Sequence, residues 1–599
     1  MSAFTTRPEL RGTFGMVAST HWLASAAGMA VLERGGNAFD AAVAAGFTLQ
    51  VVEPHLNGPG GDMPAIVRSA ERDRVQVVCG QGPAPGTATV ERLRSLGLDM
   101  VPGTGLLAPC VPGAFDGWLL MLQELGTWRL RDVLAFAIHY ADGGFPVVPR
   151  ISQAIAGVEG LFREEWTESA AIWLTGGGGA VPAPNSLHRN PTLAATYRRL
   201  VAEAEAAGPG REAEIEGARR AWSQGFVAEA IDAYLRTAEA LDVTGVRHPG
   251  LLRGEDMAGW RATLDEPASF TYGDWRVYKT RPWGQGPVFL QQLALLAGFD
   301  LRAMGPGSAD FIHAVVECAK LAYADREAWY GDPDFAPDLT ADLLDAAYTE
   351  RRRALVGDTA SLDLRPGSPG GRHPHVPRPG RAPAQDLASG VGDPTVSAPA
   401  PAPAPGDTCH VDVVDRWGNL VSATPSGGWL QSSPAIPGLG FALGTRAQIF
   451  TLEPGHPNSL APGKRPRTTL SPSLAERSDG LRLAFGTPGA DQQDQWSLSF
   501  FIGLANADRG LQEAIDTPMF HTNHFPRSFY PHHAMPGMVV VEDRVGEGVV
   551  AELRRRGHDV RVEPGWSQGR LSVVADDRGA GQLRAAANPR GMQGYAVGR

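Results

Sequence analysis

The chain changes character abruptly near residue 407, and this break constrains the fold more than any other feature. Residues 366–406 are rich in Pro, Gly, Ala and Ser, so they cannot offset the entropy lost on ordering and are expected to be flexible. The next stretch, TCHVDVVDRWGNLVSAT, alternates on both sides of a turn at 415–419 and predicts a β-hairpin. We therefore divide the chain into a mainly helical part with some strands (1–365), a tether (366–407) and a mainly β part (408–599).

Other periodicities place helices before the tether and strands after it. Residues 23–34 predict a helix that ends at Gly35, and Asn37 is the expected cap of a second, Ala-rich helix that should be buried. Further expected elements are helices within 112–140, 201–240 and 287–296, an amphipathic helix over 308–330, and strands at 481–485, 538–541, 559–562 and 570–575.

The composition indicates which partners and which cellular location to expect. A net charge of −11 with 20% charged residues is that of an ordinary acidic protein, so nucleic acid and anionic membranes are not expected as main partners. The N-terminus has neither the pattern of a signal peptide nor an apolar run, which favours a cytoplasmic protein. The four cysteines form no CxxC pair and are expected to be reduced, mostly buried thiols: Cys79, Cys110, Cys318 and Cys409.

A strand that began at Thr408 would separate its side chains onto two faces. Thr408, His410 and Asp412 would share one face, and Cys409 would point to the other. A Thr at the head of a strand is ordinarily only a good β-former, so this stretch alone does not identify chemistry.

Five segments together resemble the γ-glutamyltransferase family of N-terminal nucleophile (Ntn) hydrolases over nearly the whole chain. They are, in order, GMVASTHWLASAAGMAVLERGGNAFDAAVA, VPGAFDGW, GSADFIHAVVECAKLAYADREAWYGDPDF, GDTCHVDVVDRWGNLVSAT and APGKRPRTTLSPSL. The resemblance implies a layered α/β fold, the four-layer αββα sandwich. It also implies one precursor that cuts itself into a large and a small subunit, the small one beginning at Thr408.

The family's chemistry, carried over by position, needs neither cofactor nor metal. Thr408 would attack the carbonyl of Asp407 and so release its own α-amine, which then serves as the base for the Thr408 hydroxyl. Thr424 matches the residue that orients the nucleophile, and Gly489 and Ala490 match the oxyanion hole. We expect His410 to be structural or orienting, and Cys409 not to be a nucleophile.

The substrate pocket departs from the family pattern. Where the family holds a glutamyl group with Arg, Asn, Gln and Asp, this chain has Gln81, Gly428, Arg446 and Ile449. Losing the carboxylate partner of a buried ammonium costs roughly 3–5 kcal/mol. The sequence therefore favours an acyl group that carries a carboxylate but is not γ-glutamyl. The predicted substrate-binding residues are Gln81, Ser426, Arg446, Thr468 and Thr469.

Three readings remain open. The first is a self-processing amidohydrolase that acts on a small-molecule amide, with hydrolysis preferred to transfer. The second is a true γ-glutamyltransferase or glutathione hydrolase of glutathione metabolism, and the third is an uncut, non-enzymatic scaffold. A homodimer of processed heterodimers stays compatible with all of the sequence observations.

Several further motifs have a structural explanation as well as a functional one. GWSQG at 565–569 matches the hydrolase nucleophile elbow, but a strand is expected to follow it. The histidines of HTNHFPRSFYPHH are expected in a solvated loop rather than a zinc site. Gly58, Gly60 and Gly61 lack the Lys-Ser/Thr of a phosphate loop, and Arg467 is expected on a solvated face.

Overall fold

Two seven-stranded antiparallel sheets form the centre of the protein. The computed structural model describes residues 4–377, 408–507, 509–590 and 594–599. The first sheet has the order β1 (Leu10–Gly12), β20 (Gln582–Ala587), β19 (Ser572–Asp577), β15 (Leu481–Gly486), β14 (Ser473–Arg477), β11 (Trp275–Lys279) and β10 (Ala268–Tyr272). The second has the order β21 (Tyr595–Gly598), β2 (Gly15–Ser19), β12 (Val411–Asp415), β13 (Leu420–Ala423), β3 (Met63–Ser69), β4 (Arg74–Gly80) and β9 (Thr263–Asp265).

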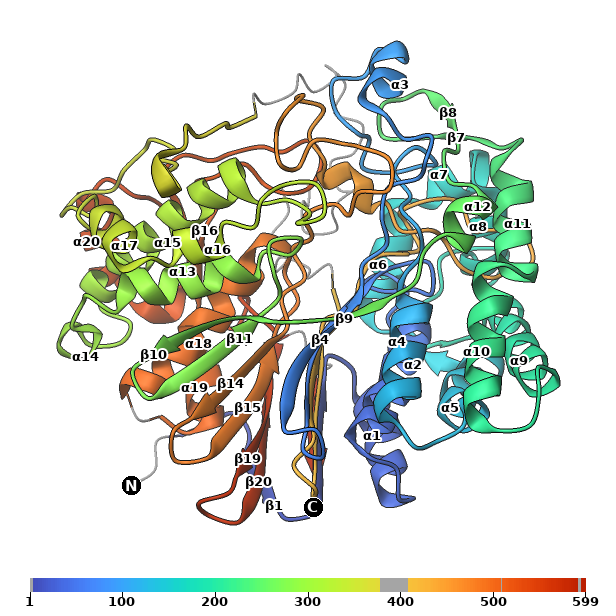
Figure 1. Cartoon of the computed structure of the whole chain (residues 1–599), viewed down its shortest axis with the longest axis horizontal. Coiled ribbons are helices and arrows are strands. Elements are labelled where there is room, and N and C mark those ends of the chain that lie inside the picture. The colour runs from blue at the N-terminus through green and yellow to red at the C-terminus, as the bar shows by residue number, and fades with distance from the viewer. Residues whose placement is uncertain (1–3, 378–407, 508, 591–593) are drawn as a thin grey trace.

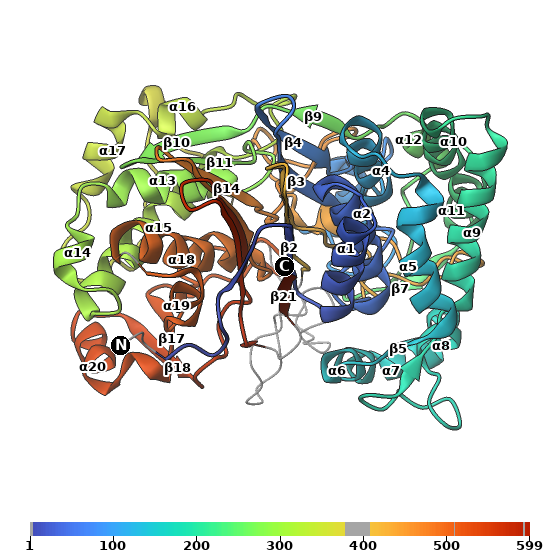
Figure 2. The same ribbon diagram turned by 90° about the horizontal axis from the view of Figure 1, so that it is seen from below.

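Helices cover the outer face of each sheet, as the view from below shows (Figure 2). The second sheet is covered by α1 (Trp22–Glu33), α2 (Ala38–Val52) and α4 (Ala114–Leu125), with α5 (Leu130–Gly143), α9 (Pro191–Ala206), α10 (Arg211–Ser223) and α11 (Phe226–Leu235) further out (Figure 1). The first sheet is covered by α13 (Gly286–Leu296), α15 (Ala309–Trp329), α18 (Gln493–Ala507) and α19 (Leu511–Asp516). The predicted αββα sandwich is thereby confirmed.

Smaller elements surround this frame. A third sheet consists of β16 (Phe520–Thr522), β17 (Met538–Glu542) and β18 (Asp559–Glu563), and two short hairpins pair β5 (Phe145–Pro146) with β6 (Leu187–His188) and β7 (Glu239–Leu241) with β8 (Arg247–Pro249). The remaining helices are α3 (Val90–Ser95), α6 (Pro149–Gly157), α7 (Glu159–Glu164), α8 (Thr167–Trp173), α12 (Gly254–Ala258), α14 (Leu301–Met304), α16 (Thr340–Leu343), α17 (Ala346–Arg353) and α20 (Glu547–Arg555). Within the described residues, no helix is both long and apolar enough to cross a bilayer.

The parts of the chain before and after Thr408 share both sheets. In the second sheet, the hairpin β12–β13 lies between β2 and β3, and in the first sheet β14 pairs with β11. Every one of these neighbours is joined by a ladder of backbone hydrogen bonds. A cut before Thr408 would therefore leave two chains that remain interleaved through both sheets. The division into residues 1–365, 366–407 and 408–599 stays a prediction, and most of the tether, 378–407, lies outside the described residues.

Local sequence signals are accurate for most elements. The Asn37 side chain accepts from the backbone N–H groups of Phe39 and Asp40, which starts α2 where it was expected, and every residue of α2 is buried. Each strand expected after the tether is present, as β15, β17, β18 and β19. The helical pattern over 112–140 corresponds to two helices, α4 and α5, and 201–240 contains the end of α9 followed by α10 and α11.

The amphipathic character expected for 308–330 is wrong. Phe311 to Trp329 of α15 are all buried, including charged side chains such as Glu317, Lys320 and Asp325. The cause is tertiary: α15 lies between α13 on one side and β16 and α20 on another. Its polar residues are paired within the protein instead of facing water.

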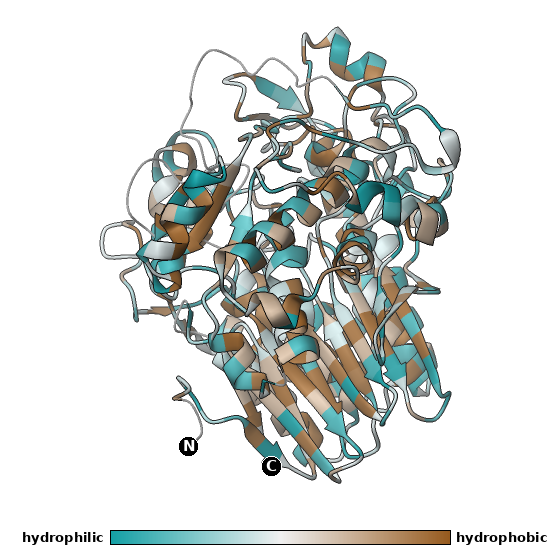
Figure 3. Ribbon diagram, turned by 90° about the vertical axis from the view of Figure 1, so that its left-hand side faces the viewer, coloured by the Kyte–Doolittle hydropathy of each residue, from teal (hydrophilic) through white to brown (hydrophobic). Residues whose placement is uncertain are grey.

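The hydrophobic core has three layers. One lies between the second sheet and its helices, one between the first sheet and its helices, and a thinner one between the two sheets. Apolar residues recur along the strands accordingly (Figure 3). The layer between the sheets matters for function, because one part of it is polar.

Stability should fall steeply as the pH is lowered below about 6.5, because burial depresses the pKa of several histidines. Burial lowers the pKa of His21, His521 and His558 from 6.5 to about 3, and that of His188, His456 and His524 to about 4. Between those values and 6.5 the unfolded chain binds more protons, so the stability present above pH 6.5 is lost as the pH falls, by up to ~1.4 kcal/mol per pH unit for each group.

The measurement is the thermal unfolding midpoint between pH 7.5 and 4.5. His188→Gln should flatten the profile, and the exposed His139 gives the matched control, His139→Gln, which should leave it unchanged. A midpoint that does not change over this range would contradict the assignment.

Candidate active site

The predicted hairpin forms, but its first strand begins later than expected. β12 starts at Val411, and Thr408 is instead held by an isolated antiparallel bridge to Ser426. The Cys409 N–H donates to the Pro425 carbonyl at 3.0 Å, so the pairing continues without a regular ladder. Thr408 is completely buried. Asp407 lies outside the described residues.

Cross-strand pairs of the hairpin form a polar ladder on the face toward the first sheet. Its three rungs are Thr408 with Ser426, His410 with Thr424, and Asp412 with Ser422, all fully buried. The next rung, Val414 with Leu420, belongs to the apolar layer between the sheets. The polar side chains therefore lie beside the apolar layer between the two sheets.

Hydrogen bonds connect the members of the polar ladder. The Thr408 hydroxyl donates to Ser426 Oγ at 3.3 Å. His410 Nδ1 lies 2.9 Å from Thr424 Oγ1, and its Nε2 lies 2.8 Å from Asp412 Oδ1. Ser572 of β19 donates to Asp412 Oδ2 at 2.7 Å, so the chain of bonds reaches the opposite sheet. The role of Thr424 in orienting Thr408 stays a prediction, and its observed partner is His410.

Cys409 points away from this ladder, toward α2. Its thiol donates to the carboxylate of Glu53 at 3.0 Å, which also accepts from Thr20. Burial and the neighbouring carboxylate raise the pKa of the Cys409 thiol well above its usual value. A thiol held in its protonated form is a poor nucleophile, as expected from the alternation of faces.

The turn predicted as the oxyanion hole has a strained backbone. Gly489 has φ +130°, and Ala490 has φ +49° in the left-handed region, which non-glycine residues seldom adopt. A Cβ at Gly489 would lie 2.2 Å from the ring of Trp496, so only glycine fits there. The turn ends directly at the start of α18. The assignment of its N–H groups to an oxyanion stays a prediction.

Arg446 has a partner that the sequence did not reveal. Its Nε and Nη2 donate to the two carboxylate oxygens of Asp62, each at 2.8 Å, and both residues are buried. Burial raises the pKa of the Asp62 carboxyl, and Arg446 opposes that shift. The positive charge that Arg446 brings to the predicted acyl site is thus largely offset by Asp62, although the Arg446 Nη1 is buried without a partner among the described residues.

Asp62 was missed because it follows the glycines that resembled a phosphate loop. A Cβ at Gly61 would lie 2.0 Å from the carbonyl of Ser426, and one at Gly60 2.2 Å from that of Ala442. The glycines allow the backbone before Asp62 to approach the segment after the hairpin, where Asp62 and Ser426 exchange two backbone hydrogen bonds. The run of glycines followed by an acid was the available signal.

Apolar side chains gather next to this ion pair. Ile449, Trp429, Phe529 and Ala490 form one buried cluster, and the Arg446 guanidinium lies 5.7 Å and 5.6 Å from the Trp429 and Phe529 ring centroids. Ile449 therefore belongs to an aromatic and aliphatic wall beside the predicted oxyanion turn.

The other predicted substrate residues are buried nearby. Gln81 lowers the pKa of the Asp62 carboxyl through a side-chain hydrogen bond. Thr468 pairs its backbone with Trp283, and its hydroxyl accepts from the Leu470 N–H. The Thr469 hydroxyl is buried without a partner among the described residues. Ser426 meets Thr408, as described above, so all five predicted residues are buried and their roles stay predictions.

The expectation for Arg467 is wrong, because Arg467 is not on a solvated face: it is buried and lies 3.1 Å from Glu327. Two acids that follow the predicted oxyanion turn are paired as well. Asp491 pairs with Arg326 and accepts from the Ser528 N–H, and Asp494 lies 2.8 Å from Lys279.

The other motifs are structural. The strand β19 follows GWSQG, as expected, so no nucleophile elbow forms. Of the four histidines expected in a solvated loop, His533 is exposed and His532 is half-buried. His521 and His524 are buried instead, because His521 lies in β16, which pairs with β17, and the His524 ring is hydrogen-bonded to the backbone of Gly537 and Asp363.

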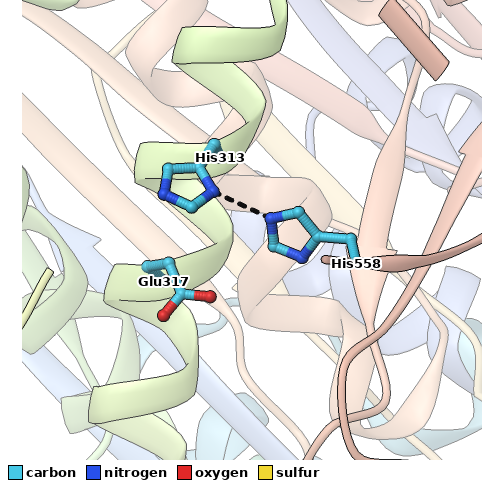
Figure 4. Close-up of side chains that lie close together, drawn as sticks. All are labelled: His313, Glu317 and His558. Carbon is cyan, nitrogen blue, oxygen red and sulfur yellow. Dashed lines mark hydrogen bonds between the residues drawn. The ribbon is translucent and has the colours of Figure 1, made fainter. Parts of the chain in front are cut away.

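One group within the described residues has the ligand atoms for a metal: His313, Glu317 and His558 (Figure 4). The two imidazoles already share a hydrogen bond of 2.8 Å, and Glu317 is paired with Lys320 at 2.6 Å and Arg365 at 3.1 Å. Two cations on the only carboxylate disfavour a divalent ion. We interpret the group as a buried structural contact.

A four-layer sandwich with a buried Thr at the head of a central hairpin defines the class of Ntn hydrolases. The chain belongs to the gamma-glutamyltranspeptidase family, which it matches over residues 24–598, and it is an amidohydrolase of that family. It is 31% identical over 599 residues to the acylase ACY 1 proenzyme of Pseudomonas sp. (strain SE83), with 97% of this chain and 94% of that protein covered.

Solved structures agree with this assignment. LmbA2991HD is 55% identical with a TM-score of 0.93, and all of both chains is covered. The cephalosporin acylase from Bacillus halodurans is 27% identical with a TM-score of 0.81, covering 100% of this chain and 98% of that one.

Proposed function

We propose that the protein cuts itself before Thr408 and then hydrolyses an amide through a Thr408 acyl-enzyme, with an acyl group that carries a carboxylate but no α-amino group. The supporting observation is the buried Thr408 hydroxyl in the polar ladder, next to Ser426 and two residues from His410. Acylases among its relatives carry names that agree with an amide substrate.

The acyl preference follows from the groups around Arg446. The charge of Asp62 is already balanced by Arg446, and Ile449 offers only hydrocarbon, so a substrate ammonium at this end would be buried without an anion of its own. The remaining donor, Arg446 Nη1, suits an acceptor oxygen such as that of a carboxylate. The aromatic wall of Trp429 and Phe529 suits an apolar acyl body.

A matched pair of substrates tests this preference. Glutaryl and γ-glutamyl anilides differ only in the α-ammonium, and we expect kcat/KM to favour the glutaryl compound by about tenfold or more, since an unpaired buried charge costs several kcal/mol. Ile449→Asp should shift the ratio toward γ-glutamyl, and the uncharged control Ile449→Asn should not. A preference for γ-glutamyl in the wild-type enzyme would identify a γ-glutamyltransferase instead.

A further inference from the structure

The polar ladder contains an acid–imidazole pair that the chemistry proposed above does not use. Three polar rungs lie between the two sheets beside an apolar layer, and burying such groups costs free energy unless each is hydrogen-bonded. His410 and Asp412 are completely buried and fully engaged. The burial of a fully hydrogen-bonded acid–imidazole pair between the two sheets indicates a role other than packing.

The partners of His410 fix where its proton lies. Nε2 faces the Asp412 carboxylate at 2.8 Å, which only accepts, so Nε2 carries the proton. The Ser422 hydroxyl, 3.5 Å away, donates to the Phe485 carbonyl and agrees with this tautomer. In the neutral imidazole Nδ1 then has a lone pair, and the Thr424 hydroxyl donates its proton to it.

The direction of the Thr424–His410 hydrogen bond decides whether the Thr424 oxygen can accept a hydrogen bond from Thr408 or donate one to it. With its proton committed to His410, the Thr424 oxygen keeps lone pairs for a further donor, and the adjacent rung on the same face of the hairpin holds Thr408. It can then accept a proton from the Thr408 hydroxyl or α-amine through a hydrogen bond, but it cannot donate one. An accepting oxygen favours the nucleophilic form of the attacking hydroxyl, whereas a donor would compete for its lone pair.

The opposite sheet is shaped to hold this pair. Ser572 of β19 donates to the second carboxylate oxygen of Asp412, so the carboxylate cannot turn away from His410. On β15, a Cβ at Gly486 would lie 2.3 Å from the His410 ring, so glycine leaves the space for the imidazole. Both sheets thus fix one orientation of the ring.

We infer that Asp412 and His410 are positioning residues that hold the Thr424 hydroxyl as a hydrogen-bond acceptor for Thr408, in self-cleavage and in turnover. The inference rests on the proposed function of Thr408. Asp412 acts through His410, and His410 through Thr424, without touching the substrate.

Asp412→Asn is the first test. The asparagine amide can donate to Nε2 as well as accept from it, so it no longer fixes the imidazole proton on Nε2. Self-cleavage followed on a denaturing gel should slow by about tenfold or more, and kcat of the processed enzyme should fall similarly while KM changes less than about twofold. The matched control is Asp415→Asn on the same strand, since Asp415 accepts from Trp417 and Asn419 of the turn and from the Ala38 N–H of α2, and has no bond to His410 or Thr424. It should keep the wild-type rates.

A double-mutant cycle tests whether Asp412 acts through Thr424. Thr424→Val removes the hydroxyl, and Asp412→Asn should then have no further effect on either rate. If Asp412→Asn does not fold, Ser572→Ala replaces it in the same cycle, with an expected loss of about threefold. Wild-type rates in the Asp412 variant, or effects that simply add with Thr424→Val, would overturn the inference. A wild-type protein that never cuts itself would instead overturn the proposed function.

Discussion

Thr408→Ala is expected to yield a single uncut chain of 599 residues without amidase activity, whereas the wild-type protein is expected to separate into residues 1–407 and the 192 residues from Thr408 to Arg599. The methyl group of alanine can neither attack the preceding carbonyl nor form an acyl-enzyme, so both reactions stop together. Intact mass and a denaturing gel measure the first effect, and an amide assay measures the second.

Two controls make this result specific. Thr408→Ser keeps the hydroxyl and should still be cut, more slowly because serine lacks the methyl group that helps fix the side chain. Cys409→Ala removes a thiol that points toward Glu53 and should be cut normally. Cutting in Thr408→Ala, or a small fragment that begins elsewhere, would show that the nucleophile is a different residue.

Removing one member of the Asp62–Arg446 pair is expected to cost about 3–5 kcal/mol of folding free energy. Asp62→Leu should be the more damaging change, because it leaves a buried guanidinium that cannot lose its proton. Arg446→Met leaves a carboxyl whose pKa burial already raises, so that group can become neutral by taking up a proton. Urea unfolding of each variant in the uncut Thr408→Ala background measures these costs on one chain.

The double variant Asp62→Leu with Arg446→Met separates pairing from packing. It buries no charge, and should lie closer to the wild-type midpoint than Asp62→Leu alone. Equal and additive losses from the two single changes would mean that the ion pair contributes nothing to the fold of the pocket.

The hairpin was accessible from the sequence because it depends on local patterns, whereas the fold and the choice of Thr408 came from the resemblance to a known family. Alternation over residues 411–423 specifies two strands whatever they pack against, and Asn37 caps α2 through bonds to residues two and three positions along the chain. Even the separation of Cys409 from His410 follows from the two-residue period of extended backbone. The start of β12 at Val411 was missed, because Thr408 is placed by a single bridge to Ser426.

The burial and the ion-pair partners of the charged residues were predicted poorly, because they do not depend on local patterns. Arg446 and Arg467 were judged by their own sequence neighbourhood, but their charges are balanced by Asp62 and Glu327, which lie far away in the chain. A charge interacts with whatever lies within a few ångströms, irrespective of sequence separation. The burial of α15 was missed likewise, since its polar residues find partners on other elements.

The sequence alone determined the hairpin and the start of α2, because backbone periodicity and turn chemistry are written over a few consecutive positions, and its resemblance to a known family implied the sandwich. The properties that only the tertiary structure decided are the hydrogen bonding around Thr424 and the charge balance of Arg446. Those properties depend on Ser572, Asp412 and Asp62 meeting the site from different strands and loops, and hydrogen bonds and ion pairs act through space.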